Sequence, residues 1–207
     1  MKRVQAKHVF LILVLLLAAG ALYGWSILAR GFSAKGEPSA VESFVATRLR
    51  RMATPDRARD TKNPVQMTPE VLAAAKAHFA DHCASCHGND GRGSTLIGRG
   101  LYPKPPDMTQ GSTQGLTDGE LYYIIENGIR FTGMPAFGEE EGNESNEESW
   151  VLVHFIRHLP SMTDDEAIEM KKMNPKSPAE LAKEEQMRRF LAGEDVQPAE
   201  GAHEHHH

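Results

Sequence analysis

Two cysteines and a histidine form the most informative chemical pattern in the chain. The run reads Cys83-Ala84-Ser85-Cys86-His87, and it holds both cysteines of the sequence. C-x-x-C-H is the pattern by which c-type haem is attached. Two thiols at this spacing can each bond one vinyl group of the same haem, and the adjacent histidine is then held where its imidazole can ligate the iron. The pattern predicts one covalent haem c.

Two other uses of this pattern are less favoured. A structural zinc site usually has four protein ligands. The chain has no second cysteine pair, so His78 and His82 would have to turn back to complete the set. A dithiol redox motif usually accompanies a βαβ arrangement, and no strand pattern is present. Haem attachment is therefore the preferred interpretation.

A methionine is the expected sixth ligand of the iron. Met134 lies 47 residues after His87 (134 − 87), within Gly133-Met134-Pro135. The glycine permits close approach, the proline stiffens the loop, and a thioether favours ferrous iron and raises its reduction potential. Met108, 21 residues after His87 (108 − 87), is a rival candidate that ranks lower.

Three main helices are expected to position these residues. Each has a capping residue at its start, followed by apolar residues at helical spacing. Their start signals are Thr68, Thr117 and Asn146, and their stop signals include Asn127-Gly128 and Pro160. Residues 91–115 are rich in glycine and proline, which favours irregular structure. The pattern predicts an all-α core without internal repeats.

The sequence resembles the class I cytochromes c, particularly the single-haem, membrane-anchored bacterial type. The resemblance rests on Cys83 to Gly88, on residues 121–138 with their Gly-Met-Pro loop, and on the helix over 150–160. It covers about residues 68–160. It implies a small cytochrome c fold, with three main helices around one covalent haem c and electron transfer as the activity.

The same resemblance implies roles for individual side chains. His87 and Met134 would be the axial ligands, and the first and last helices would cross, with Phe79 against Phe155 or Ile156. A loop proline carbonyl would accept a hydrogen bond from His87; the candidates are Pro103, Pro105 and Pro106. The candidate propionate contacts are Arg92, Arg99 and Tyr102. The side chains expected on the haem face are Tyr122, Ile125 and Phe137.

The N-terminal segment, residues 1–30, has the length of a membrane anchor. Val9 to Ala29 form 21 uncharged residues (29 − 9 + 1), and 21 helical residues reach about 30 Å, the thickness of the hydrocarbon core. A cleaved signal peptide remains the alternative, with Ala19-Gly20-Ala21 as a small-residue cleavage site. The length favours an uncleaved anchor, because the apolar region of a signal peptide is usually shorter.

The expected haem also predicts the topology. Maturation of c-type cytochromes, as the resemblance implies, takes place outside the cytoplasmic membrane. Residues 30–207 would then lie on the periplasmic side of a single-pass protein of the cytoplasmic membrane, with Lys2, Arg3 and Lys7 inside. This orientation agrees with the positive-inside tendency.

Residues 31–67 form an amphipathic segment followed by a tether. Five apolar residues recur at helical spacing with arginines among them: Val41, Phe44, Val45, Leu49 and Met52, with Arg48, Arg50 and Arg51. Such a helix either lies in the headgroup region of a membrane or packs on the protein or a partner subunit, and the sequence leaves both open. Residues 54–66 contain two prolines and many charges and predict an extended tether.

Residues 161–207 predict a charged helical extension with a His-rich tail. Thr163 and Ser177 begin two helices with thin apolar stripes. The tail, His203 to His207, is a candidate copper, zinc or nickel site or a remnant of expression. The acidic run Glu139 to Glu148 is a candidate docking loop for a basic redox partner, although such runs are usually solvated. His154 and His158 are four apart, which suits either a metal pair or ordinary helix histidines.

The expected function is one-electron transfer by a membrane-tethered cytochrome c, rather than catalysis. Redox proteins would act as donor and acceptor, within the respiratory chain and in a larger complex or as a free shuttle. The alternative is a haem enzyme or sensor with a labile sixth ligand. A net charge of −5 gives no support for nucleic-acid binding.

Overall fold

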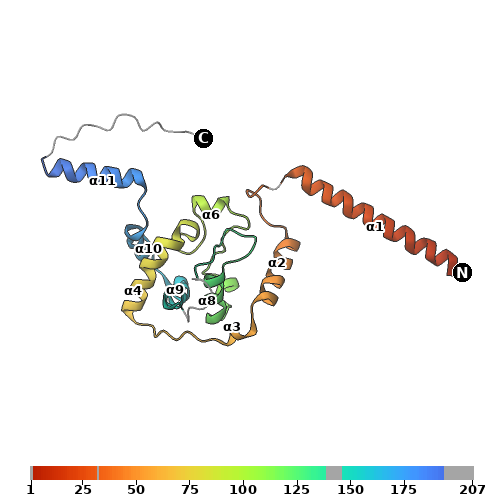
Figure 1. The fold of residues 1–207 in the computed structure, drawn as a ribbon, viewed down its shortest axis with the longest axis horizontal. Helices are drawn as coiled ribbons and strands as arrows, with labels where there is room; N and C mark the ends of the chain where they lie inside the picture. The colour runs from red at the N-terminus through yellow and green to blue at the C-terminus, as the bar shows by residue number, and fades with distance from the viewer. Residues whose placement is uncertain (1, 32, 139–145, 194–207) are drawn as a thin grey trace.

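The computed structural model describes residues 2–31, 33–138 and 146–193, and all the regular secondary structure of this part of the chain is helical (Figure 1). The helices are α1 Lys2–Arg30, α2 Ala40–Ala53, α3 Asp56–Asp60, α4 Pro69–His78, α5 Ala84–His87, α6 Leu96–Gly100, α7 Gly111–Gln114, α8 Asp118–Asn127, α9 Glu147–His158, α10 Asp164–Met170 and α11 Pro178–Leu191. A π-helical turn, Phe79–Cys83, joins α4 to α5, and 3-10 turns follow α9 (Leu159–Ser161) and α10 (Lys171–Met173). The all-α fold class is confirmed.

Local capping signals begin the three main helices where the sequence predicts. The Thr68 hydroxyl accepts the backbone N–H of Val71 at the start of α4, and Pro69 is the first residue of that helix. Thr117 and Glu120 form a reciprocal capping box at α8, and the Asn146 side chain caps α9. Each cap satisfies a backbone donor that has no partner inside its own helix.

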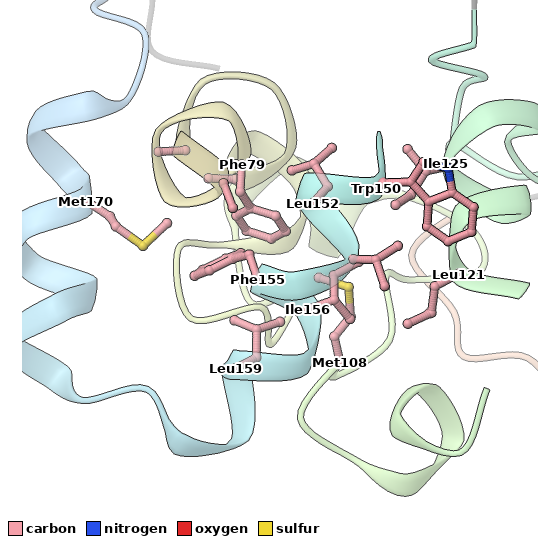
Figure 2. Close-up of a cluster of buried hydrophobic side chains, with 14 residues drawn as sticks. Phe79, Met108, Leu121, Ile125, Trp150, Leu152, Phe155, Ile156, Leu159 and Met170 are labelled. Atoms are coloured by element: carbon pink, nitrogen blue, oxygen red, sulfur yellow. The ribbon is translucent and has the colours of Figure 1, made fainter. Parts of the chain in front are cut away.

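The core forms where α4 and α8 pack against α9 (Figure 2). Phe79 and Phe155, both almost fully buried, lie with ring centroids 4.7 Å apart, which confirms the expected contact between the first and last helices. Tyr122 of α8 stacks on Trp150 of α9 at 4.0 Å between centroids. These aromatic pairs fix α9 between the other two helices, and burial of rings of this size dominates the packing energy.

Residues 54–66 differ from the extended tether that their composition predicts. They contain the short helix α3, whose Ala58 is buried against α8. A Cβ atom on Gly119 would lie 1.9 Å from the carbonyl oxygen of Ala58, so only glycine permits this approach. The Asn63 amide donates to the Trp150 carbonyl (2.9 Å), and Val65 O lies 2.8 Å from His154 Nε2. Contacts with α8 and α9, which composition does not predict, thus hold this segment against the domain.

The N-terminal helix α1 extends away from the rest of the molecule (Figure 1). Its segment Lys7–Ala29, 23 residues, is long and apolar enough to cross a membrane, and none of it is buried within the protein. This length and composition suit both an anchor and a signal sequence. Within the described residues, no other helix has these properties.

Glu166 joins α10 to the core, which leads to a prediction about acid stability. Its carboxylate accepts a hydrogen bond from Lys76 of α4 and lies 3.0 Å from His158 Nε2 of α9. The Lys76 hydrogen bond, the Thr163 backbone N–H and the His158 contact lower the pKa of Glu166 to about 2. We expect Glu166→Gln to lower the free energy of unfolding by about 1 kcal/mol near pH 7, since the group is partly exposed and the interaction is screened.

The pH dependence of that difference follows from the lowered pKa. The stabilisation is present above the unfolded-state value near 4.5 and is lost as the pH falls towards about 2, because the proton then binds the folded state as well. Denaturant unfolding of the wild type and of Glu166→Gln at pH 7 and pH 3 measures the difference in free energy of unfolding. Glu169→Gln, an exposed position on the same helix, is the control. If wild type and Glu166→Gln differed in free energy of unfolding by the same amount at both pH values, the lowered pKa of Glu166 would be contradicted.

Candidate haem-binding site

The run Cys83 to His87, which we call the Cys83 motif, begins at the end of the π-helical turn that follows α4. This turn, Phe79–Cys83, leads directly into α5, which carries Cys86 and His87. Single π turns within helices are rare and occur often at functional sites. α5 ends at Gly88, whose φ of 74° suits glycine, and the Gly88 N–H donates to the Ala84 carbonyl (2.9 Å). The two thiols and the imidazole are therefore held on one short, well-defined stretch.

The helix α6 packs closely against this motif. The Thr95 hydroxyl donates to the Cys86 carbonyl (3.1 Å) and accepts from the Gly98 N–H (2.8 Å). A Cβ atom on Gly98 would lie 2.5 Å from the Cys86 carbonyl oxygen, too close for any other residue without movement of the backbone. The Gly93 N–H donates to the His87 carbonyl (2.7 Å). The loop after the motif thus fixes both its cysteine and its histidine end.

The loop that carries Met134 folds back against the end of α8. The Ile129 N–H donates to the Met134 carbonyl (3.1 Å), and the Phe137 N–H donates to the Ile125 carbonyl (3.1 Å). Gly128, with φ of 62°, makes the reversal; a Cβ atom there would meet the backbone of Pro135 at 2.6 Å. Backbone hydrogen bonds on both sides of the methionine therefore set its position.

These elements bring His87 and Met134 to the same cavity, although they lie 47 residues apart (134 − 87). The lining is almost entirely apolar, and it draws on the motif, the methionine loop, α8 and α9. It consists of Phe79, Cys83, His87, Met108, Ile125, Met134, Phe137, Leu152 and Ile156. The cavity has the soft and aromatic surroundings that a haem face requires, together with one imidazole and two thioethers.

The imidazole of His87 is in a state that suits metal binding. Burial lowers its pKa, so the ring is neutral at pH 7, as a metal ligand must be. Its Nδ1 atom is buried and has no hydrogen-bond partner among the described residues. The expected hydrogen bond from the His87 ring N–H to a carbonyl of Pro103, Pro105 or Pro106 is therefore not formed, because that loop places no acceptor at Nδ1.

The thiol of Cys83 is also withdrawn from solvent. Burial, with a smaller contribution from Cys86, raises its pKa to about 12. The side chain is consequently a neutral thiol that forms part of the apolar wall. Both cysteines are free and partly buried, which leaves both sulfur atoms for thioether bonds to a haem.

Several side chains predicted around the haem have other partners. The Tyr102 hydroxyl donates to Glu42 (3.2 Å), and Arg99 donates to the Ser94 carbonyl (3.1 Å). Arg92 is exposed, beside Asp90 on a separate polar surface. Tyr122 stacks on Trp150 and does not line the cavity. Of the three predicted haem-face residues, Ile125 and Phe137 do line it.

Leu152 was not predicted at the site, and Met108 was predicted only as a rival ligand. Leu152 is 2% exposed and lies four residues before Ile156 on α9, a spacing that places both on one helix face. Met108, 6% exposed, belongs to the core cluster (Figure 2). It also lines the cavity. Helical spacing from Ile156 would have identified the leucine, but no local signal indicates that Met108 turns inward.

The two histidines of α9 have separate partners, as ordinary helix histidines do, and do not form the metal pair that their spacing also suits. His154 Nε2 faces the Val65 carbonyl, whereas His158 Nε2 faces Glu166. No group of three or more metal-ligating side chains is found among residues 2–31, 33–138 and 146–193. The His-rich tail over 203–207 and most of the acidic run over 139–148 lie outside the described residues.

Comparison with protein families agrees with this site. Residues 70–156 match the family described as "Cytochrome C oxidase, cbb3-type, subunit III". The chain is also similar to a chain of a reducing HAO-like protein complex from Kuenenia stuttgartiensis, with 28% identity and a TM-score of 0.41. That similarity covers 46% of this chain and 46% of the other, about half of each. Comparison with the curated proteins gives no match.

The donor set and the family match lead to the same cofactor. Two free thiols three residues apart, a buried neutral imidazole and an apolar cavity fit a covalently attached haem. The matched residues 70–156 include the whole Cys83 motif and the methionine loop. The chain therefore carries a cytochrome c domain, over the residues that match the cbb3-type subunit III family, with one covalent haem c, behind an N-terminal apolar helix.

Proposed function

We propose that this protein is a one-electron carrier in which His87 and Met134 are the axial ligands of the haem iron and Cys83 and Cys86 hold the haem covalently. The observation that carries the proposal is the shared cavity, which His87 and Met134 both line. When bound, the haem supplies a reversible one-electron change at iron. The domain family is typical of electron transfer, and two saturating ligands leave no open position for substrate.

The chain's own residues would set the properties of the centre. The neutral ring of His87 is an electron-donating ligand, and the thioether of Met134 favours the reduced state. Ile125, Leu152 and Phe137 provide an apolar wall, which restricts solvent and so supports a high reduction potential. The hydrogen bonds that anchor residues 129–138 to α8 hold the methionine loop in place and limit rearrangement between redox states.

We further propose that α1 is an uncleaved single-pass anchor of the cytoplasmic membrane, with the haem domain on the periplasmic side. Support comes from the 23-residue apolar segment and from the extracytoplasmic location typical of c-type cytochromes. The donor and the acceptor would be redox proteins at the same membrane surface. Since the matched family is named for an oxidase subunit, service as the cytochrome subunit of a larger respiratory complex is part of this proposal.

The test is a redox titration and a carbon monoxide assay on the full-length, haem-loaded protein. A carrier with two protein ligands gives a single one-electron transition and a ferrous spectrum that carbon monoxide leaves unchanged. Rapid carbon monoxide binding by the wild-type ferrous protein would overturn the proposal. It would favour the alternative of a haem enzyme or sensor with a labile sixth ligand.

A further inference from the structure

The helix α2 leaves its apolar side chains exposed in the described structure. None of its residues is buried, and the exposed fraction reaches 71% for Val41 and 80% for Met52. At about 100° per residue, the apolar positions fall within about 140° of the helix circumference. They are Val41, Phe44, Val45, Leu49 and Met52. The helix thus carries a continuous apolar stripe, which we call the α2 stripe.

The haem domain contacts α2 from the opposite side. Arg50 is the partly buried residue of the helix, its pKa is lowered chiefly by burial, and it is close enough to Glu120 of α8 to interact electrostatically. It lies about 170° from the centre of the α2 stripe at about 100° per residue. Tyr102 donates to Glu42 at the edge of the helix, and Figure 1 shows α2 along the outside of the domain. The α2 stripe therefore faces away from the haem domain.

Two arginines lie where a lipid surface would require them. Arg51 borders the α2 stripe, and Arg48 lies within it, with its guanidinium 5.5 Å from the centre of the Phe44 ring. Arginine can bury its hydrocarbon stem among apolar groups while its charged end reaches phosphate. A protein partner with an apolar groove would exclude Arg48, whereas lipid headgroups accept it.

The position of α2 in the chain brings it to the membrane. The apolar segment of α1 ends at Ala29, and α2 begins at Ala40, which leaves residues 30–39 between them. Ten residues span at most about 35 Å when fully extended. The α2 stripe consequently lies within reach of the surface that α1 would cross.

From these observations we propose that α2 is an interfacial helix whose stripe inserts into the headgroup region of a membrane containing anionic phospholipid. Glu42 binds Tyr102, and Glu37 forms an ion pair with Lys104, so α2 is connected to the loop that follows the haem motif. A membrane-bound α2 would hold the haem domain in one orientation at the surface. The proposal goes beyond electron transfer and does not depend on which methionine binds the iron.

Cysteine labelling of the full-length holoprotein tests this. Both natural cysteines are consumed by the haem, so Val41→Cys introduces a single reactive thiol on the stripe. Ser43→Cys, two residues away and on the opposite side, is the matched control; both positions are exposed. In nanodiscs containing phosphatidylglycerol, a water-soluble maleimide should label the Val41→Cys thiol about tenfold more slowly than in detergent-free amphipol, and Ser43→Cys should change less than about twofold.

Further labelling measurements identify whether lipid or protein covers the α2 stripe. Adding Arg48→Glu and Arg51→Glu to Val41→Cys should restore fast labelling, because the anionic surface then repels the helix. Equal labelling of the two cysteines in nanodiscs would overturn the proposal. Protection seen in native membranes but absent from nanodiscs would also overturn it, since a protein rather than lipid would then cover the stripe. An unchanged haem spectrum verifies that each variant is folded.

Discussion

Met134→Ala is expected to remove the methionine–iron charge-transfer band from the ferric spectrum and to lower the reduction potential. The change should be a substantial part of the roughly 0.8 V range over which axial ligands set haem potentials. Loss of the thioether removes the ligand that favours ferrous iron. The open sixth position should then bind carbon monoxide in the ferrous state. Absorption spectroscopy and potentiometric titration of the purified protein measure all three effects.

Met108 is the decisive control, because its side chain lines the same cavity. Met108→Leu conserves side-chain volume in a buried position, so we expect less than about 1.5 kcal/mol of destabilisation and an unchanged charge-transfer band. If Met108→Leu removed the band and Met134→Ala retained it, Met108 would be the ligand. If neither substitution changed the spectrum, the sixth ligand would be another group altogether.

The double substitution Cys83→Ala/Cys86→Ala is expected to abolish covalent haem. Attachment requires the two thiols as bonding atoms, so covalent haem should fall from one per chain to a background of about a few per cent. Staining for haem after denaturing electrophoresis measures the loss. A second consequence should be a marked drop in holoprotein yield, since the cavity between the motif and α9 would lack the group that fills it.

Ser85→Ala is the matched control for this loss. Ser85 lies between the two cysteines, is exposed, and its hydroxyl makes only a long contact of 3.9 Å to the Cys86 sulfur. Its haem content should equal that of the wild type. Covalent haem that persisted in the double variant would place the attachment elsewhere and contradict the site.

Features that depend on near neighbours in the chain could be predicted from the sequence alone. The capping boxes at Thr117, Thr163 and Ser177 all form as expected, because the N-cap side chain and the third helical residue lie within one turn. The Cys83 motif is equally local, since its thiols and imidazole lie within five residues, where the π-helical turn meets α5. The contact between Phe79 and Phe155 was implied by the resemblance to class I cytochromes c and not by spacing, and the structure confirms it.

Features that require distant segments to meet were decided by the tertiary structure. The sequence ranks Met134 above Met108, but only the packed fold places both at the cavity with His87. Likewise, the composition of residues 54–66 predicts an extended tether, whereas in the structure Ala58 packs closely against Gly119. A contact across tens of residues depends on how whole helices pack and on closing the chain between them, which costs entropy that local pattern does not reveal. Motif and helix ends are therefore local properties of this chain, whereas its ligand geometry is a property of the fold.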